Sequence, residues 1–185
     1  YNEAYKAYSQ MTIAEKNAHS HRGQALQQMK YHLENTYGAK HIVVPMAIIV
    51  RDGKLLMNLR NDPHRPENHR KWEFPGGTVE FGETVEENLL REAREETGFE
   101  IEIVTLLPKI PSRTVASETY QYQVFLLPYV CRIKSGDERP SDREVLKLEW
   151  FEPDKVPMKE LLGANQEVYT SLLTEINKTI REHNL

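Results

Sequence analysis

The stretch 76–99, GGTVEFGETVEENLLREAREETGF, constrains the fold of this 185-residue chain more than any other, because it carries signals for both ends of a helix. Thr84 followed three residues later by Glu87 is typical of a capping box, in which each side chain bonds the other residue's backbone N–H. Gly98 is typical of the left-handed residue that ends a helix. These signals predict a helix over 85–97. Its apolar stripe, which would face a sheet, comprises Val85, Leu89, Leu90 and Ala93.

Three glutamates near the end of this helix are spaced so that they can act together. Glu92, Glu95 and Glu96 lie at i, i+3 and i+4, so their side chains meet on one face beside the apolar stripe. Like charges at this spacing repel by roughly 0.2–0.5 kcal/mol per pair, and the helix macrodipole disfavours negative charge near the C-terminal end. A hard divalent cation such as Mg²⁺ offsets the repulsion through oxygen coordination. The trio predicts a metal site, and a solvated acidic face is the alternative.

Two further features surround this helix. Gly76 and Gly77 precede it, and glycine lets the backbone approach a ligand closely because it has no side chain. A glycine carbonyl could then face a metal or a phosphate, although many such pairs are simply turns. Glu83 and Arg91 lie just over two helical turns apart, so that a Glu83 folded back at the helix start predicts an ion pair that orients the site.

Strand-like and helical segments flank the glutamate helix. Their order indicates an α/β or α+β fold with a mixed sheet, and no internal repeat is visible. Residues 1–40 contain no proline and predict one or two helices outside the sheet, for packing or for forming a homodimer. The segments read as strands are 42–50, 55–59, 72–74, 101–107, 120–133 and 145–151, and those read as helices are 156–162 and 165–185.

Composition places the chain among ordinary globular proteins and excludes several classes. It is 39% hydrophobic and 28% charged, with a formal net charge of −4, which argues against a surface for polymeric nucleic acid but not against a nucleotide. The single cysteine, Cys131, excludes an internal disulfide and fits a reducing compartment, so we expect a cytoplasmic protein. Nothing approaches 18 consecutive apolar residues, so no membrane span is expected.

The residues of this region together resemble the Nudix box, Gly-x5-Glu-x7-Arg-Glu-U-x-Glu-Glu-x-Gly-U, where U is bulky and apolar. The two U positions hold Ala93, which is smaller than ideal, and Phe99, which is aromatic. The resemblance covers about 41–185 and leaves 1–40 as an N-terminal helical extension. Every other fixed position matches: Gly77, Glu83, Arg91, Glu92, Glu95, Glu96 and Gly98.

The resemblance implies an α/β/α sandwich with a mixed sheet and hydrolysis of a phosphoanhydride bond in a nucleoside diphosphate linked to another group. It implies that Mg²⁺ or Mn²⁺ is held by Glu92, Glu95 and Glu96 with the Gly77 carbonyl, and that Glu83 and Arg91 form the supporting pair. One carboxylate, Glu92 or Glu95, would be the general base. Glu144, in a charged loop, is a further candidate ligand or base, or a solvated loop acid.

Substrate choice depends on residues outside the box. The segment KWEFPGG, 71–77, is similar to MutT-type members that hydrolyse nucleoside triphosphates, including oxidised ones, to a monophosphate and pyrophosphate. Trp72 and Phe74 alternate on a strand and could stack on a base, with core packing as the alternative. The long polar loop 61–71 could supply Arg65, Arg70 or Lys71 to phosphates, with a solvated loop as the alternative. Arg60, just before this loop, is a second candidate.

Other functions remain open from the sequence. An ADP-ribose or nucleotide-sugar pyrophosphatase is one, although Thr114 stands where ADP-ribose pyrophosphatases place a proline, with Pro111 nearby. A non-catalytic module that senses a nucleotide is another, although such modules usually lose acids of the box. His19 and His21 could form a second metal pair, or could be ordinary surface histidines.

Overall fold

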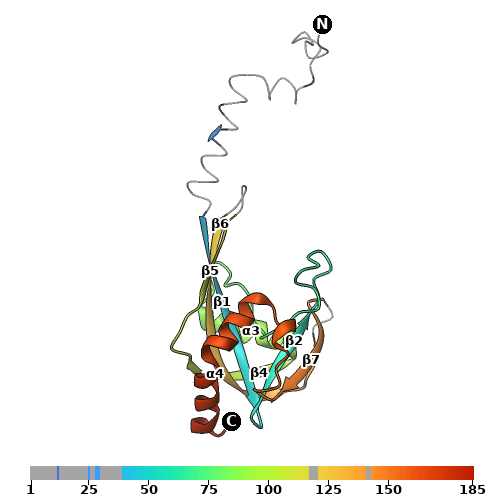
Figure 1. Cartoon of the computed structure of the whole chain (residues 1–185), viewed down its shortest axis with the longest axis vertical. Helices are drawn as coiled ribbons and strands as arrows, with labels where there is room; N and C mark the ends of the chain where they lie inside the picture. The colour runs from blue at the N-terminus through green and yellow to red at the C-terminus, as the bar shows by residue number, and fades with distance from the viewer. Residues whose placement is uncertain (1–11, 13–24, 26–27, 30–38, 117–120, 141–142) are drawn as a thin grey trace. The chain divides into compact units, whose positions relative to one another are not determined.

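The computed structural model describes residues 12, 25, 28–29, 39–116, 121–140 and 143–185 (Figure 1). The chain divides into two compact units, one of 41–113 with 124–185 and the other of 1–40 with 114–123. Within the expected extension 1–40, Ala25, Gln28 and Met29 are helical, whereas His19 and His21 lie outside the described residues. The domain boundary near residue 40, the histidine pair and the homodimer therefore stay predictions.

Seven strands form one sheet, in which β3, β2, β1, β6 and β4 follow one another, β7 pairs with β2 and β5 pairs with β6. The turn between β1 and β2 is formed by Asp52 and Gly53, both with positive φ, as a tight hairpin turn requires. The strands are β1 Ala39–Arg51, β2 Lys54–Arg60, β3 Trp72–Glu73, β4 Phe99–Leu106, β5 Ser112–Ala116, β6 Gln121–Gly136 and β7 Val145–Phe151.

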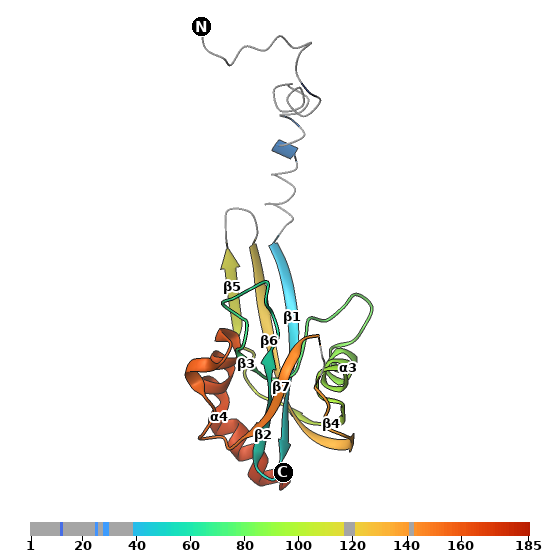
Figure 2. The same cartoon turned by 90° about the vertical axis from the view of Figure 1, so that its right-hand side faces the viewer.

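Two helices cover opposite faces of the sheet, α3 Val85–Thr97 and α4 Gly163–His183 (Figure 2). Because side chains alternate along a strand, β1 supplies both cores: Ile48 packs in the core that contains α4, and Ile49 packs in the core that contains α3. The expected α/β/α sandwich is confirmed. Among the described residues, no helix is long and apolar enough to cross a membrane.

Three local expectations differ from the structure. Strand β5 has a polar sequence that does not signal a strand, and it forms because it pairs with β6. The helix expected over 156–162 is only a 3₁₀ turn at Met158–Glu160, which follows Pro157 and ends where Leu161 turns extended and bridges to Trp72. Leu90, expected on the buried stripe of α3, is 36% exposed, since it lies one residue around the helix from that stripe.

The adjacent leucines of α3 test how much this packing stabilises the fold. Leu89 is fully buried against the sheet, so Leu89→Ala should lower the free energy of unfolding by about 2–5 kcal/mol. Leu90→Ala, the matched control at the next position, should cost about 1 kcal/mol or less. Denaturant unfolding of both variants measures the difference, and equal losses would contradict this orientation of α3.

Candidate functional site

The helix that carries the acids begins and ends where its sequence signals predict. Thr84 precedes α3, and its hydroxyl accepts a hydrogen bond from the Glu87 N–H at 3.2 Å. The Glu87 carboxylate accepts in return from the Thr84 N–H at 2.8 Å, which completes the capping box. At the other end Gly98 has a φ of 80° and donates its N–H to the Arg94 carbonyl at 2.9 Å. Both predicted caps are confirmed.

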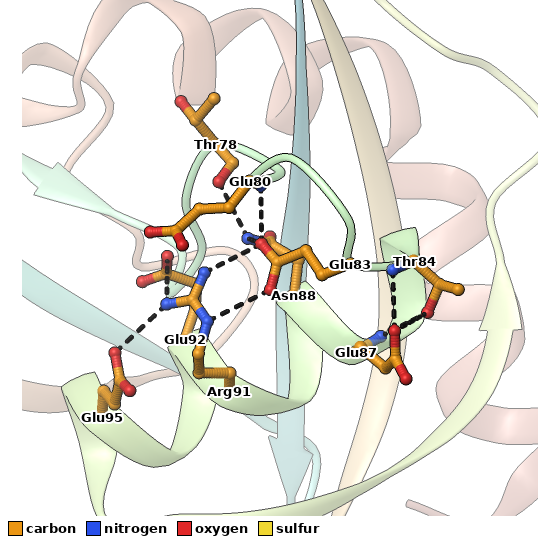
Figure 3. A network of polar contacts seen from close by, with 9 residues as sticks. All are labelled: Thr78, Glu80, Glu83, Thr84, Glu87, Asn88, Arg91, Glu92 and Glu95. Atoms are coloured by element: carbon orange, nitrogen blue, oxygen red, sulfur yellow. Dashed lines mark hydrogen bonds and ion pairs between the residues drawn. The ribbon is translucent and has the colours of Figure 1, made fainter.

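Arg91 is the centre of the polar contacts on the outer side of α3 (Figure 3). Its Nε and Nη2 donate to the two carboxylate oxygens of Glu83 at 3.2 and 3.0 Å, so the predicted ion pair is confirmed. Its Nη1 donates to Glu92 at 2.9 Å and to Glu95 at 3.2 Å. A single guanidinium thus binds three carboxylates and offsets part of the repulsion among them.

Glu83 is held by more than its arginine. Its Oε1 also accepts from the Glu80 backbone N–H and from Asn88 Nδ2, both at 2.7 Å. The hydrogen bonds from Arg91, with those from Glu80 and Asn88, lower the pKa of Glu83 to about 2. Asn88 Nδ2 donates in addition to the Thr78 carbonyl at 2.9 Å, which ties the loop before α3 to the helix. The sequence reasoning missed Asn88; a polar residue beside the buried stripe was its only signal.

Glu92 and Glu96 lie against the glycine pair. Glu96 is 6% exposed, and one of its carboxylate oxygens accepts from the Gly76 N–H at 2.9 Å. Its burial, together with the nearby Glu73 carboxylate, raises the pKa of Glu96 well above its ordinary value. A Cβ on Gly77 would collide with the carboxylate of Glu92. A side chain at position 77 would therefore displace the Glu92 carboxylate from its place beside the backbone.

Glu73 is a buried acid that the sequence reasoning did not single out. It lies between Trp72 and Phe74 on β3, so its side chain points to the opposite face, toward α3. Arg60 Nη1 donates to it at 3.3 Å. Burial outweighs this partner and raises the pKa of Glu73 to about 7. Asn58, the cross-strand neighbour of Glu73, is fully buried. Among the described residues, none forms a hydrogen bond with the side-chain amide of Asn58.

Gly76, Gly77, Glu92 and Glu96 border a cleft of about 830 Å³. Its acidic wall carries Glu92, Glu96 and the exposed Glu144. Asn61 fixes the backbone beside Glu144, since its N–H donates to the Glu144 carbonyl at 2.7 Å. Arg60 lies on the cleft as well, and its guanidinium pairs with Asp62 at 3.1 Å and with Glu73.

The structure separates the expected substrate residues. Arg60 and Arg65 line the cleft, whereas Arg70 is exposed in the loop and does not. Trp72 and Phe74 are 7% and 2% exposed and pack in the core that contains α4, on the other face of the sheet from the acids. Their positions match the core-packing alternative, because alternation on β3 turns Glu73, and not the rings, toward the site.

The donor set fits a hard divalent cation. Carboxylates of Glu92 and Glu96 lie on one wall with the Gly77 backbone, and all are oxygen ligands of the kind that Mg²⁺ and Mn²⁺ prefer. The Glu92 carboxylate occupies the space that a side chain at 77 would fill, so it lies directly against the Gly77 backbone. In the described part of the chain no three acidic, histidine or cysteine groups already converge as a metal centre, and Glu95 is engaged by Arg91.

Comparison with known proteins assigns the fold and site to one family. Residues 39–172 match the NUDIX domain. A MutT-like protein of Streptomyces ambofaciens is 33% identical over 124 residues, 66% of this chain and 71% of the relative. The CTP pyrophosphohydrolase of Escherichia coli is 48% identical over 61 residues, 33% of this chain and 44% of the relative. The crystal structure of a MutT NUDIX hydrolase from Burkholderia pseudomallei is 30% identical, with a TM-score of 0.60, over 71% of this chain and 97% of that one.

The α/β/α sandwich with an acidic helix against a glycine pair defines the class, that of the Nudix hydrolases. This chain belongs to the NUDIX domain family, which its match over most of its length establishes. The matched segments cover between 20% and 71% of the length of four curated relatives. The expected family is therefore confirmed, while the reaction of the whole protein is inferred below.

The Glu83 contacts predict a pH-dependent contribution to stability. The pKa of Glu83 is lowered from 4.5 to about 2 in the folded protein, so its contribution is present above the unfolded pKa and is lost as the pH falls through the folded one. Glu83→Gln should lower the melting temperature at pH 7, and the gap to the wild type should narrow from about pH 5 toward pH 2. Glu80→Gln, an exposed neighbour whose backbone bond to Glu83 remains, should show no such gap. A gap that stays constant with pH would contradict the assignment.

Proposed function

We propose that this protein is a divalent-metal-dependent nucleotide pyrophosphohydrolase. It adds water across a phosphoanhydride bond of a nucleoside triphosphate, including oxidised forms, and yields a monophosphate and pyrophosphate. The observation that carries the proposal is the shared wall of Glu92, Glu96 and Glu144 against the Gly77 backbone in a cleft of about 830 Å³. This wall gathers oxygen donors beside a space that can receive a phosphate chain.

The acids of the box would hold Mg²⁺ or Mn²⁺, through Glu92, Glu95, Glu96 and the Gly77 carbonyl. When bound, such a cation neutralises charge on the diphosphate and lowers the pKa of an attacking water. Glu95 would exchange its bond to Arg91 for the cation. Glu144 would add a further ligand, and its position on the same wall of the cleft supports this role.

Arg91 and Glu83 act as positioning residues in this proposal. The guanidinium is fixed by two bonds to Glu83 and presents its remaining donor to Glu92, whose carboxylate is thereby oriented toward the cleft. Glu92 and Glu95 are the candidates for the general base. The site favours Glu92, because it lines the cleft and because burial raises its pKa, which makes a carboxylate a better proton acceptor.

The substrate class rests on the likeness to proteins named for triphosphate chemistry. The Escherichia coli relative is named a CTP pyrophosphohydrolase, and its match spans 61 residues. The cleft also holds cationic side chains, Arg60 and Arg65, for a polyanionic ligand. We further infer a reducing compartment such as the cytoplasm, because the sequence has a single cysteine, Cys131, which is a buried free thiol.

Neutralising the acid wall should separate an enzyme from a module that only senses nucleotides. Glu96→Gln should reduce kcat/KM by about 10²-fold or more, as expected when a ligand that acts in the transition state is lost. Glu92→Gln, Glu95→Gln and Glu96→Gln combined should abolish calorimetric binding of Mn²⁺. Glu167→Gln, an exposed acid on α4, is the control. Unchanged Mn²⁺ binding by the triple variant would reject the metal site.

A substrate panel tests the reaction itself. The purified protein, supplied with Mg²⁺, should hydrolyse one or more nucleoside triphosphates or oxidised deoxynucleoside triphosphates to a monophosphate and pyrophosphate, and EDTA should stop the reaction. ADP-ribose and nucleotide sugars complete the panel. Clear turnover of these, with no turnover of any triphosphate, would replace the proposal by an ADP-ribose or nucleotide-sugar pyrophosphatase. Product analysis by ion-exchange chromatography distinguishes pyrophosphate from inorganic phosphate.

A further inference from the structure

A second hollow of about 490 Å³ lies at the C-terminal end of α3. It adjoins the cleft, since Glu96, Arg143 and Glu144 line both. The two cavities therefore meet at the acid wall and share Arg143. Arg60 and Arg65 line only the cleft, whereas Arg94 and Arg139 line only the second hollow. The residues that line the second hollow are Arg94, Glu95, Glu96, Arg139, Arg143 and Glu144.

Backbone hydrogen bonds hold two of its arginines in place. The Arg139 N–H donates to the Thr97 carbonyl in the last turn of α3 at 2.8 Å. On the other side of the hollow, Asn61 Nδ2 donates to the Arg143 carbonyl at 3.0 Å. Both side chains therefore start from backbone that is anchored beside the acid wall, to the last turn of α3 and to Asn61 after β2.

The arginines of the hollow differ from the other arginines of the site in their ion pairs. Arg91 is bound by three carboxylates and Arg60 by two, so neither has much capacity left for a ligand anion. Within the described part of the chain, Arg139 and Arg143 form no ion pair, and both are exposed. Arg94 has only a long contact of 3.9 Å to Glu100. Two guanidinium groups without an ion pair to a described acid therefore line the second hollow, and one of them, Arg143, also borders the cleft.

We propose that this hollow is the subsite for the terminal phosphates of the substrate, with Arg139 and Arg143 as the donors that bind them. This inference rests on the proposed function. A guanidinium binds two phosphate oxygens at once and keeps its charge at any physiological pH. The bond that breaks then lies at the acid wall, and the nucleoside occupies the larger cleft. A sugar in place of the γ-phosphate is uncharged and would gain less from these arginines, so the hollow favours triphosphates.

The test compares three single variants. Arg139→Gln and Arg143→Gln each remove one guanidinium, and Arg181→Gln removes an exposed arginine from α4, on the opposite face of the sheet. The KM for the best triphosphate of the panel should rise about tenfold or more in the first two, with a smaller change in kcat, as loss of a charged hydrogen bond predicts. Inorganic pyrophosphate, titrated calorimetrically with Mg²⁺ present, should bind about tenfold or more weakly. Arg181→Gln should match the wild type in both.

Further measurements separate the outcomes. Arg139→Lys keeps the charge but loses the paired donors, so its KM should lie between those of the wild type and Arg139→Gln, and thermal unfolding checks that each variant folds. If the wild type hydrolyses triphosphates while both glutamine variants keep its KM and pyrophosphate affinity within about twofold, the subsite is overturned and the proposed function stands. If the wild type hydrolyses no triphosphate, the proposed function fails and the assignment of the hollow fails with it.

Discussion

The contact between Arg91 and Glu83 organises the acidic face of α3. Four acids of the box would repel one another if they stood alone. The guanidinium donates to Glu83 along one edge, and its Nη1 donates to Glu92 and Glu95. Asn88 also holds this arrangement in place, because its buried side chain donates hydrogen bonds both to Glu83 and to the Thr78 carbonyl in the loop. The result is a set of carboxylates whose positions are fixed before any ligand arrives.

Packing of α3 against the sheet also positions the acids. Ala93 is fully buried, so α3 lies close to β1 and brings Glu96 to the N–H of Gly76. The Gly76 backbone is in turn bridged to Met46 of β1, and the next residue, Gly77, has no side chain that could displace Glu92. The acid wall is therefore a joint product of helix and sheet, and a small residue at 93 and a glycine at 77 are its steric conditions.

The distribution of arginines divides this wall into two functional sides. On the cleft side Arg60 is already compensated by Asp62 and Glu73, and the exposed Arg65 is the further cation there. On the other side Arg139 and Arg143 are exposed and have no ion-pair partner within the described residues. A polyanionic ligand that meets both sides would be oriented by this difference, because its most highly charged end gains most from uncompensated guanidinium groups.

Local signals in the sequence were sufficient to predict the acidic helix, its caps and the spacing of its acids. The caps at Thr84 and Gly98, the spacing of the three glutamates and the Glu83–Arg91 pair depend only on residues a few positions apart, so helical geometry relates them without knowledge of the rest of the chain. The strands of the sheet were legible for the same reason, as apolar runs bounded by turns. Strand β5 was not, because its polar sequence becomes a strand only through pairing with β6.

What only the tertiary structure decided is which distant residues share the site. Glu73, Arg139 and Arg143 reach the acid wall because separate strands meet there, and no local pattern reports such a meeting. Trp72 and Phe74 show the same limit: alternation implies that both rings point one way, but the packing of α4 determines that this way is the core. Sequence by itself thus determined the acidic helix and its family, because those depend on short-range geometry. The folded chain alone determined the surroundings of that helix, because long-range packing sets which side chains are buried, paired or left free to bind.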